Sequence, residues 1–305
     1  MENYIRQIND YLPIDFNDEE NNIYRRYIMD AYIENLENKK YQFALLAFHL
    51  MFMSFVFKEF WGLKEFDYQK VKRFCDNNKQ LSEVCKMFDM SILPEKVAID
   101  NAMNALGFHV NHRSAVQNFV DARDKCAHAS GIIQYTESDI QYHMIKALDY
   151  AGRIQDKTKQ HIQSQFMIGV KEYWDGDNKY KLSVDFAEEL MKRLKLSPKE
   201  IEQLFEIDKT LLLSGVPKES KLSTEISYYM ILSVLQSQYI ENTSDYALIV
   251  PVDWLFINLR DFWRKLSDVE KTSIEVELED ELNASKERYS TVSFSILTST
   301  LVENR

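Results

Sequence analysis

Apolar residues recur at intervals of three and four along nearly the whole chain, and sustained strict alternation is absent. Intervals of three and four place apolar side chains on one face of an α-helix, whereas alternation would indicate β-strands. Glycine and proline, which interrupt helices, account for only 7 and 5 of the 305 residues. The sequence therefore predicts an all-α fold with long helices and few tight turns.

Helix start and stop signals refine this prediction in the first half of the chain. Pro94 is typical of a helix start, and Gly107 and Gly131 are typical of helix ends. Thr136, followed three residues later by Asp139, is a helix N-cap pattern. The expected helices lie near residues 17–36, 40–61, 67–77, 79–90, 95–106, 112–130 and 138–165.

The stretch KEYWDGDNKYKLS at residues 171–183 interrupts the helical pattern with Asp, Gly and Asn, and predicts a linker or hairpin. Short helices follow it, one of them with Ser197 as the cap and Pro198 in its first turn. The chain is long enough for two domains. We predict a helical bundle over residues 1–165 and a second helical region over residues 166–305.

Composition excludes several classes of function. The formal net charge of −11 is spread over both halves of the chain, so a whole-surface grip on nucleic acid is not expected, although screening still allows a local basic site. The three cysteines, Cys75, Cys85 and Cys126, lack paired CxxC spacing, which argues against disulfides and a zinc site. We expect no metal, no cofactor and a cytoplasmic location with free thiols.

Residues 43–57, FALLAFHLMFMSFVF, form the one stretch that resembles a membrane span. A span needs about 20 apolar residues, and this run contains His49 and ends at Lys58 and Glu59. We therefore expect a buried helix of a bundle and no membrane association, with His49 as a core histidine whose hydrogen bonds are satisfied.

The stretch FVDARDKCAH at residues 119–128 holds an arginine where an apolar residue is expected. On a helix of about 3.6 residues per turn, Arg123 falls in the middle of the stripe formed by Val116, Phe119 and Val120. A guanidinium there must extend to the surface, pair with a buried acid, or face a second protein surface or an anion.

His128 lies in the last turn of the same expected helix, just before Gly131. The negative end of the helix dipole favours the protonated imidazole there, which suits proton transfer near neutral pH. A histidine that only caps the last carbonyl groups is the alternative interpretation.

Arg123 and His128 together resemble the R-x(4–6)-H motif of the HEPN superfamily of small helical bundles, here as RDKCAH. The apolar residues upstream of the motif and the aromatic-rich helix at 40–61 are similar to the family pattern, over roughly residues 15–165. The resemblance implies a metal-independent ribonuclease, usually dimeric, with Arg123 and His128 as the catalytic pair. Family members often act as RNA-cleaving toxins or in defence against phage, which implies an antitoxin or another regulatory partner.

Asp124 stands where this family most often has asparagine, and its charge is unfavourable beside an RNA phosphate. We expect it to orient His128 from one helical turn away. Lys125, His112 and Arg113 are further candidates for substrate contacts. The basic run at residues 68–74 is more simply a solvated helix face than an RNA site.

The chemistry that the resemblance implies is physically consistent with these residue types. A histidine can move the proton of the RNA 2′-OH or of the leaving oxygen, and an arginine can neutralise charge on the phosphate. Because Arg123 and His128 are about 7.5 Å apart along one helix, we expect a composite site across a homodimer. A non-catalytic module that binds a nucleotide or protein, and a helical scaffold with a structural Arg123 ion pair, remain open.

Overall fold

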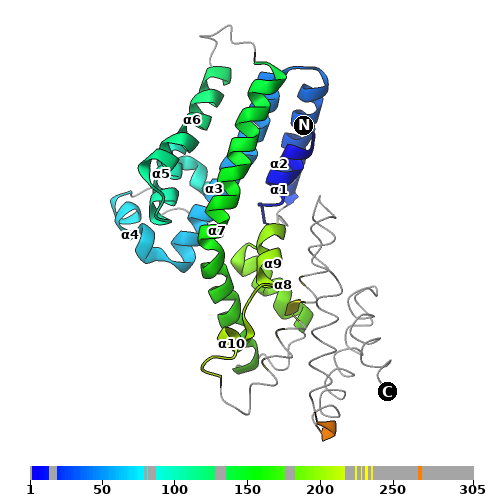
Figure 1. Ribbon diagram of the computed structural model, residues 1–305, viewed down its shortest axis with the longest axis vertical. Coiled ribbons are helices and arrows are strands. Elements are labelled where there is room, and N and C mark those ends of the chain that lie inside the picture. The colour runs from blue at the N-terminus through cyan, green and yellow to red at the C-terminus, as the bar shows by residue number, and fades with distance from the viewer. Residues whose placement is uncertain are drawn as a thin grey trace. The chain divides into compact units, whose positions relative to one another are not determined.

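The computed structural model describes residues 2–13, 19–78, 81, 87–127, 135–175, 183–216, 224, 228, 231, 232, 235 and 267–269. Every regular element in these residues is a helix, which confirms the all-α prediction (Figure 1). The elements are α1 (Glu2–Asn9), α2 (Glu19–Glu37), α3 (Tyr41–Phe66), α4 (Tyr68–Asn77), the 3₁₀-helix η2 (Met87–Ile92), α5 (Glu95–Ala105), α6 (Val110–Ala127), α7 (Glu137–Asp175), α8 (Ser183–Leu194), α9 (Pro198–Leu204) and α10 (Lys209–Leu212).

Several elements differ in extent from the sequence-based expectation. Helix α7 continues through residues 171–175, which were expected in a linker, because its apolar spacing continues at the buried Phe166 and Val170. The expected helix at 79–90 falls largely outside the described residues, and its last part belongs to η2. Helix α1 was not expected; it is stabilised by burial of Ile5 and Ile8.

The predicted capping residues adopt the geometry that their sequence pattern indicates. The Thr136 Oγ1 accepts a hydrogen bond from the Asp139 N–H at 3.3 Å, and the Asp139 carboxylate accepts the Thr136 N–H at 2.8 Å. After α5, Gly107 has φ +75°, and the Phe108 N–H reaches the Met103 carbonyl at 2.9 Å. This left-handed position favours glycine and ends the helix. Gly131 lies outside the described residues.

The chain divides into two compact units, and each unit contains two separate stretches of the sequence. Unit 1 contains residues 1–162 and 195–200, and unit 2 contains residues 163–194 and 201–305. The chain therefore leaves the first unit within α7 and contributes one further short segment to it, from the end of α8 into the first turn of α9.

Helix α3 is the centre of unit 1. It contacts α1, α2, α4, α5, α6 and η2, and residues 51–60 are all buried. By length and composition alone α3 could cross a membrane, but 83% of that apolar window is buried inside the protein. The aromatic rings of α3 supply much of the core; Phe52, for example, packs edge-on against Phe119 of α6 at 5.3 Å between centroids.

Two charged residues of α3, Lys58 and Glu59, are buried in the same core. The Lys58 ammonium donates to Glu59 at 2.9 Å and to Glu200, which is also buried. Burial alone would lower the pKa of Lys58, but Glu200 and Glu59 raise it above its usual value; burial raises the pKa of Glu200. The segment 195–200 thus supplies, through Glu200, a carboxylate that pairs with the buried ammonium of Lys58.

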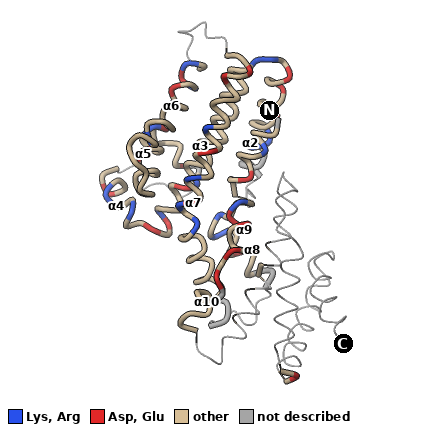
Figure 2. Tube along the Cα trace, in the orientation of Figure 1, with Lys and Arg blue, Asp and Glu red and all other residues tan. Residues whose placement is uncertain are grey.

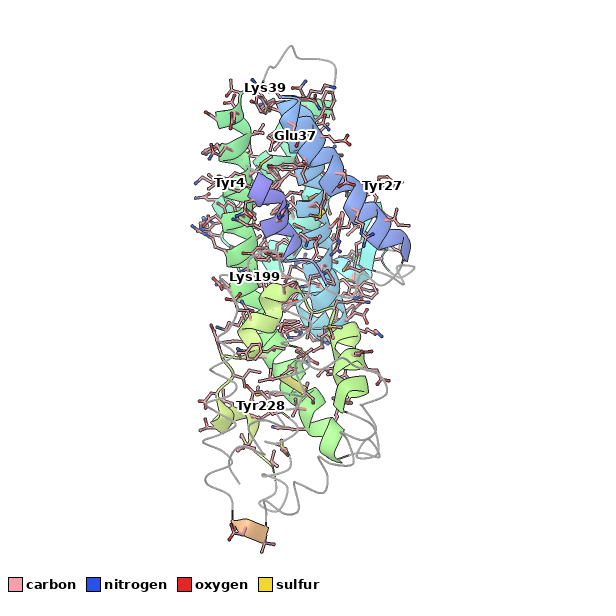
Figure 3. All side chains as sticks on the ribbon, turned by 90° about the vertical axis from the view of Figure 1, so that its right-hand side faces the viewer. Tyr4, Tyr27, Glu37, Lys39, Lys199 and Tyr228 are labelled. Atoms are coloured by element: carbon pink, nitrogen blue, oxygen red, sulfur yellow. The ribbon has the colours of Figure 1, made fainter. Side chains whose placement is uncertain are left out.

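The same segment is held by its own helix cap and by a backbone contact. As predicted, Ser197 caps α9: its Oγ accepts the Glu200 N–H at 3.2 Å, and its own N–H donates to the Glu200 carboxylate at 2.9 Å. The Lys199 N–H donates to the Asp10 carbonyl at 3.1 Å, next to α1, and Lys199 is labelled in Figure 3. One carboxylate, Glu200, therefore serves both the cap and the buried ammonium.

Unit 2 packs the end of α7 closely against α8. A side chain at Gly169 would place its Cβ 2.6 Å from Leu190 Cδ1, so any larger residue would require the buried Leu190 side chain to shift. The buried Tyr228 packs its ring on Phe166, with 6.2 Å between centroids, and donates its hydroxyl to the Leu204 carbonyl at 3.3 Å. These contacts give unit 2 an apolar core of its own.

We expect the Lys58→Met variant to lose about 3–5 kcal/mol of unfolding free energy, because it leaves two buried carboxylates without their cation. Urea unfolding followed by circular dichroism measures this loss. The control is Lys70→Met on α4, whose surface pair with Asp67 at 2.8 Å should be worth less than about 1 kcal/mol. Equal losses from the two variants would contradict the importance of the buried cluster.

Candidate functional site

Arg123 lies in the last described turns of α6, beside the first turn of α5. Its Nη2 donates to the Glu95 carboxylate, and its Nη1 forms an ion pair with Asp124 at 3.0 Å. The side chain is 27% exposed, so the guanidinium is neither sealed in the core nor fully in water. Of the options that the sequence left open, the structure shows pairing with an acid, while part of the guanidinium remains accessible.

The acid that holds Arg123 is itself held from the core. Glu95 Oε2, the oxygen that accepts from Arg123, is also 2.9 Å from Nε2 of His49. An ionised carboxylate has no proton to give, so the ring donates through Nε2. His49 is fully buried on α3 and packs against Phe119, with 5.1 Å between ring centroids. The result is a continuous chain of contacts, His49–Glu95–Arg123, which we call the Glu95 relay.

The relay fixes the charge of its central member. Burial alone would raise the pKa of Glu95, but the hydrogen bond and charge of His49, followed by those of Arg123, lower it below its usual value. Glu95 is therefore ionised at neutral pH. Two groups remain only partly satisfied: the buried Nδ1 of His49 and the buried Nε of Arg123 have no hydrogen-bond partner among the described residues.

The other predicted site residues are only partly brought together. Asp124 contacts Arg123, whereas its predicted role beside His128 is untested because His128 lies outside the described residues. Lys125 is exposed two residues beyond Arg123. His112 and Arg113 lie about 15 Å back along α6, and Arg113 donates to Asp100 at 2.9 Å. They are therefore not gathered around Arg123.

Two residues near Arg123 were not among the sequence-based candidates. His143 of α7 packs on Phe119 at 6.2 Å and feels the charge of Lys125; burial lowers its pKa. Tyr135 donates its hydroxyl to the Ala122 carbonyl at 3.3 Å. Glu95 was also missed: only its position directly after Pro94 marked it, and no sequence signal links it to an arginine 28 residues away.

The arrangement offers charge and hydrogen-bond donors rather than metal ligands. No group of three or more His, Cys, Asp or Glu residues able to hold a metal ion occurs in the described part of the chain. Cys75 and Cys126 are free thiols there, and burial raises the pKa of each. What the site presents is a partly exposed guanidinium, positioned by a carboxylate and flanked by Asp124.

Comparisons with protein-family models, with curated proteins and with solved structures found no match to this chain. The geometry of the relay and the residues around it are therefore the basis for any functional conclusion.

The lowered pKa of Glu95 predicts a specific loss of stability in acid. A carboxylate whose pKa is lowered on folding stabilises the fold above its unfolded pKa of about 4.3, and this contribution is lost as the pH falls through the folded value. The Glu95→Gln variant should show a weaker dependence of melting temperature on pH between roughly pH 5 and pH 3. The exposed Glu37→Gln variant is the control for losing one charge. Parallel curves for the parent and Glu95→Gln would contradict the relay.

Proposed function

We propose that this chain is a metal-independent endoribonuclease of the HEPN kind, with Arg123 and His128 as its catalytic pair. The observation that carries the proposal is the partly exposed guanidinium of Arg123, fixed by the Glu95 relay five residues before His128. A structural ion pair needs no exposure, whereas a group that neutralises a bound phosphate needs both a fixed position and access to solvent. The all-α bundle around α3 is compatible with the family resemblance.

The proposed reaction uses the nucleophile that RNA carries. The 2′-oxygen attacks the neighbouring phosphorus and forms a 2′,3′-cyclic phosphate, while the bond from phosphorus to the 5′-oxygen breaks. One His128 accepts the 2′-OH proton, and a second protonates the departing 5′-oxygen. Arg123 stabilises the charge on the non-bridging oxygens. Two histidines imply two protomers, so the proposal includes a homodimer acting in the cytoplasm as a toxin or phage-defence effector under a regulatory partner.

The Arg123–Glu95 contact also supports a second candidate function. The contact between Arg123 and Glu95 also suits a helical scaffold in which the arginine only neutralises a half-buried acid. The two candidates differ in what truncation of Arg123 does. In the scaffold, stability falls and no chemistry is lost; in the nuclease, the rate falls even where the protein is fully folded.

The first test is RNA cleavage by the full chain in EDTA. Relative to the parent, Arg123→Ala should lower the rate about 10²–10³-fold, and His128→Ala about 10²–10⁴-fold. Arg193→Ala is the matched control, since Arg193 is an exposed arginine of α8 paired with Glu172 at 3.3 Å. Circular dichroism establishes that each variant is folded at the assay temperature, because loss of the Glu95 bond should cost about 1–3 kcal/mol.

The products distinguish this mechanism from contamination by another nuclease. An oligonucleotide with one 2′-deoxyribose at the cleaved position should resist cutting there, and the natural product should end in a 2′,3′-cyclic phosphate. Parent protein that cuts no RNA excludes the nuclease. In that case, a stability loss from Arg123→Ala supports the scaffold, and unchanged stability with nucleotide or protein binding supports a non-catalytic module.

The composite site makes a separate prediction. Sedimentation at micromolar concentration should show a dimer, and mixing the inactive Arg123→Ala and His128→Ala proteins should restore part of the activity. Mixed dimers regain only part of the activity because they hold one Arg123 and one His128 in the shared groove, whereas each single-variant dimer lacks one of these residues in both protomers. A monomeric parent, or a mixture as inactive as its components, would show that the site does not form across two chains.

A further inference from the structure

The solvent face of α7 within unit 1 alternates aromatic rings with cations. Tyr142, Lys146, Tyr150, Arg153 and Lys157 follow one another at intervals of four and three residues, which places them on one side of the helix over about 22 Å. We call this set the α7 ladder. Lysine and arginine positions recur along this stretch of α7 in Figure 2, with aspartates between them.

The rings and cations of the ladder are in contact. The Lys146 ammonium lies 5.9 Å from the centre of the Tyr142 ring, and the Arg153 guanidinium lies 5.6 Å from that of Tyr150. Lys157 lies 5.8 Å from the ring of Phe108, in the connection between α5 and α6. The Tyr142 side chain is nevertheless 60% exposed, so its ring still has surface for another planar group.

The ring of His112 extends the ladder sideways onto α6. His112 meets Tyr150 at 6.2 Å and Phe108 at 6.3 Å between ring centroids. At the other end, His143 follows Tyr142 and packs on Phe119, one helical turn before Arg123. The ladder therefore begins beside the part of α6 that carries the proposed catalytic arginine, and it runs away from it.

The charges of the ladder are largely uncompensated. Neither Lys146 nor Lys157 forms an ion pair with another described residue, and Arg153 pairs only with Asp149 at 3.1 Å. Such an exposed pair within one helix is worth only about 0.3–0.5 kcal/mol, so a phosphate can replace the aspartate. Of the remaining acids nearby, Asp139 is engaged in capping Thr136, and Asp156 is exposed.

The exposed ring of Tyr142, the half-buried ring of Tyr150 and the exposed cations between and beyond them suit one class of ligand. Single-stranded nucleic acid offers the flat faces of its bases to aromatic side chains and its phosphates to lysine and arginine. A duplex hides its base faces, an acidic peptide would leave the rings unused, and an apolar helix would bury the cations at a loss. From Tyr142 to Lys157 the chain carries three cations and two aspartates, a local net charge of +1 on a chain with a net charge of −11.

We propose that the α7 ladder binds single-stranded RNA, with bases stacked on Tyr142 and Tyr150 and phosphates held by Lys146, Arg153 and Lys157. The ladder thereby leads the strand toward Arg123. The choice of RNA over other single strands rests on the proposed function. The inference assigns the substrate class, single-stranded rather than duplex RNA, and a binding surface separate from the reacting groups.

The test is binding of a fluorescein-labelled 12-nucleotide oligouridine with 2′-O-methyl riboses, which cannot undergo 2′-OH attack. Fluorescence anisotropy of the full chain in EDTA at several salt concentrations gives the dissociation constant and its salt dependence. The variant Lys146→Ala/Arg153→Ala/Lys157→Ala should bind at least about tenfold more weakly and reduce the log–log salt slope by about 2, at about 0.7 per phosphate contact. Tyr142→Ala should weaken binding by about fivefold or more, whereas Tyr142→Phe retains it.

Matched controls come from other helices of the same unit. The variant Lys70→Ala/Lys72→Ala/Arg73→Ala removes three cations from α4, and Tyr27→Ala removes a tyrosine of α2 that is 69% exposed and labelled in Figure 3. Both should bind like the parent. The proposal is overturned if the parent does not bind at 100 µM protein, if the α4 variant weakens binding as much, or if a duplex or polyglutamate of equal charge binds as tightly as the oligouridine.

Failure of this proposal can be told apart from failure of the proposed function. Binding that needs the ladder, in a protein that cuts no RNA, supports the ladder and removes the nuclease. Cleavage by the parent, with ladder variants that bind like the parent, supports the nuclease and removes the ladder.

Discussion

The burial of α3 is the constraint from which the rest of unit 1 follows. A helix surrounded by other helices has no route to water for the polar side chains in its middle, so each must find a partner inside the protein. His49 finds Glu95 of α5, and Lys58 finds Glu59 and Glu200. These requirements determine which elements must lie against α3. The need for a carboxylate at Lys58 explains why residues 195–200 belong to unit 1 although the chain on both sides of them belongs to unit 2.

The same constraint produces the candidate site. The fully buried His49 holds the Glu95 carboxylate in place from the core. Glu95 can therefore position the long, flexible side chain of Arg123 without help from surface residues. Side-chain entropy is the main penalty for using an arginine in a precise role, and the relay removes much of that freedom before any ligand arrives. An arginine that serves only to neutralise Glu95 would be equally well placed, which is why rate and stability must be measured on the same variants.

The fold was largely accessible from the sequence, and the site was not. Local signals, such as Thr136 with Asp139, Ser197 with Pro198, and Gly107, correctly predicted helix ends, because capping depends on residues close together in the sequence. Helix α1 was not predicted because its eight residues are stabilised by burial rather than by a local sequence pattern. The partner of Arg123 could not be predicted: the stripe position left open extension to the surface, a buried acid, a second protein surface or an anion, and only packing of α5 against α6 selects Glu95.

The charges around Arg123 indicate that the residues that attract a polyanion differ from the residue that is proposed to act on it. Glu95 and Asp124 together more than balance the charge of Arg123, so this group cannot attract RNA to a protein with a net charge of −11. Attraction must come from cations without acidic partners, and Lys146 and Lys157 of α7 meet that condition within the part of the chain that the structure describes. In the proposed function, Arg123 acts only on a strand that is already held: the phosphate takes the place of Asp124, while the Glu95 carboxylate keeps the guanidinium in position.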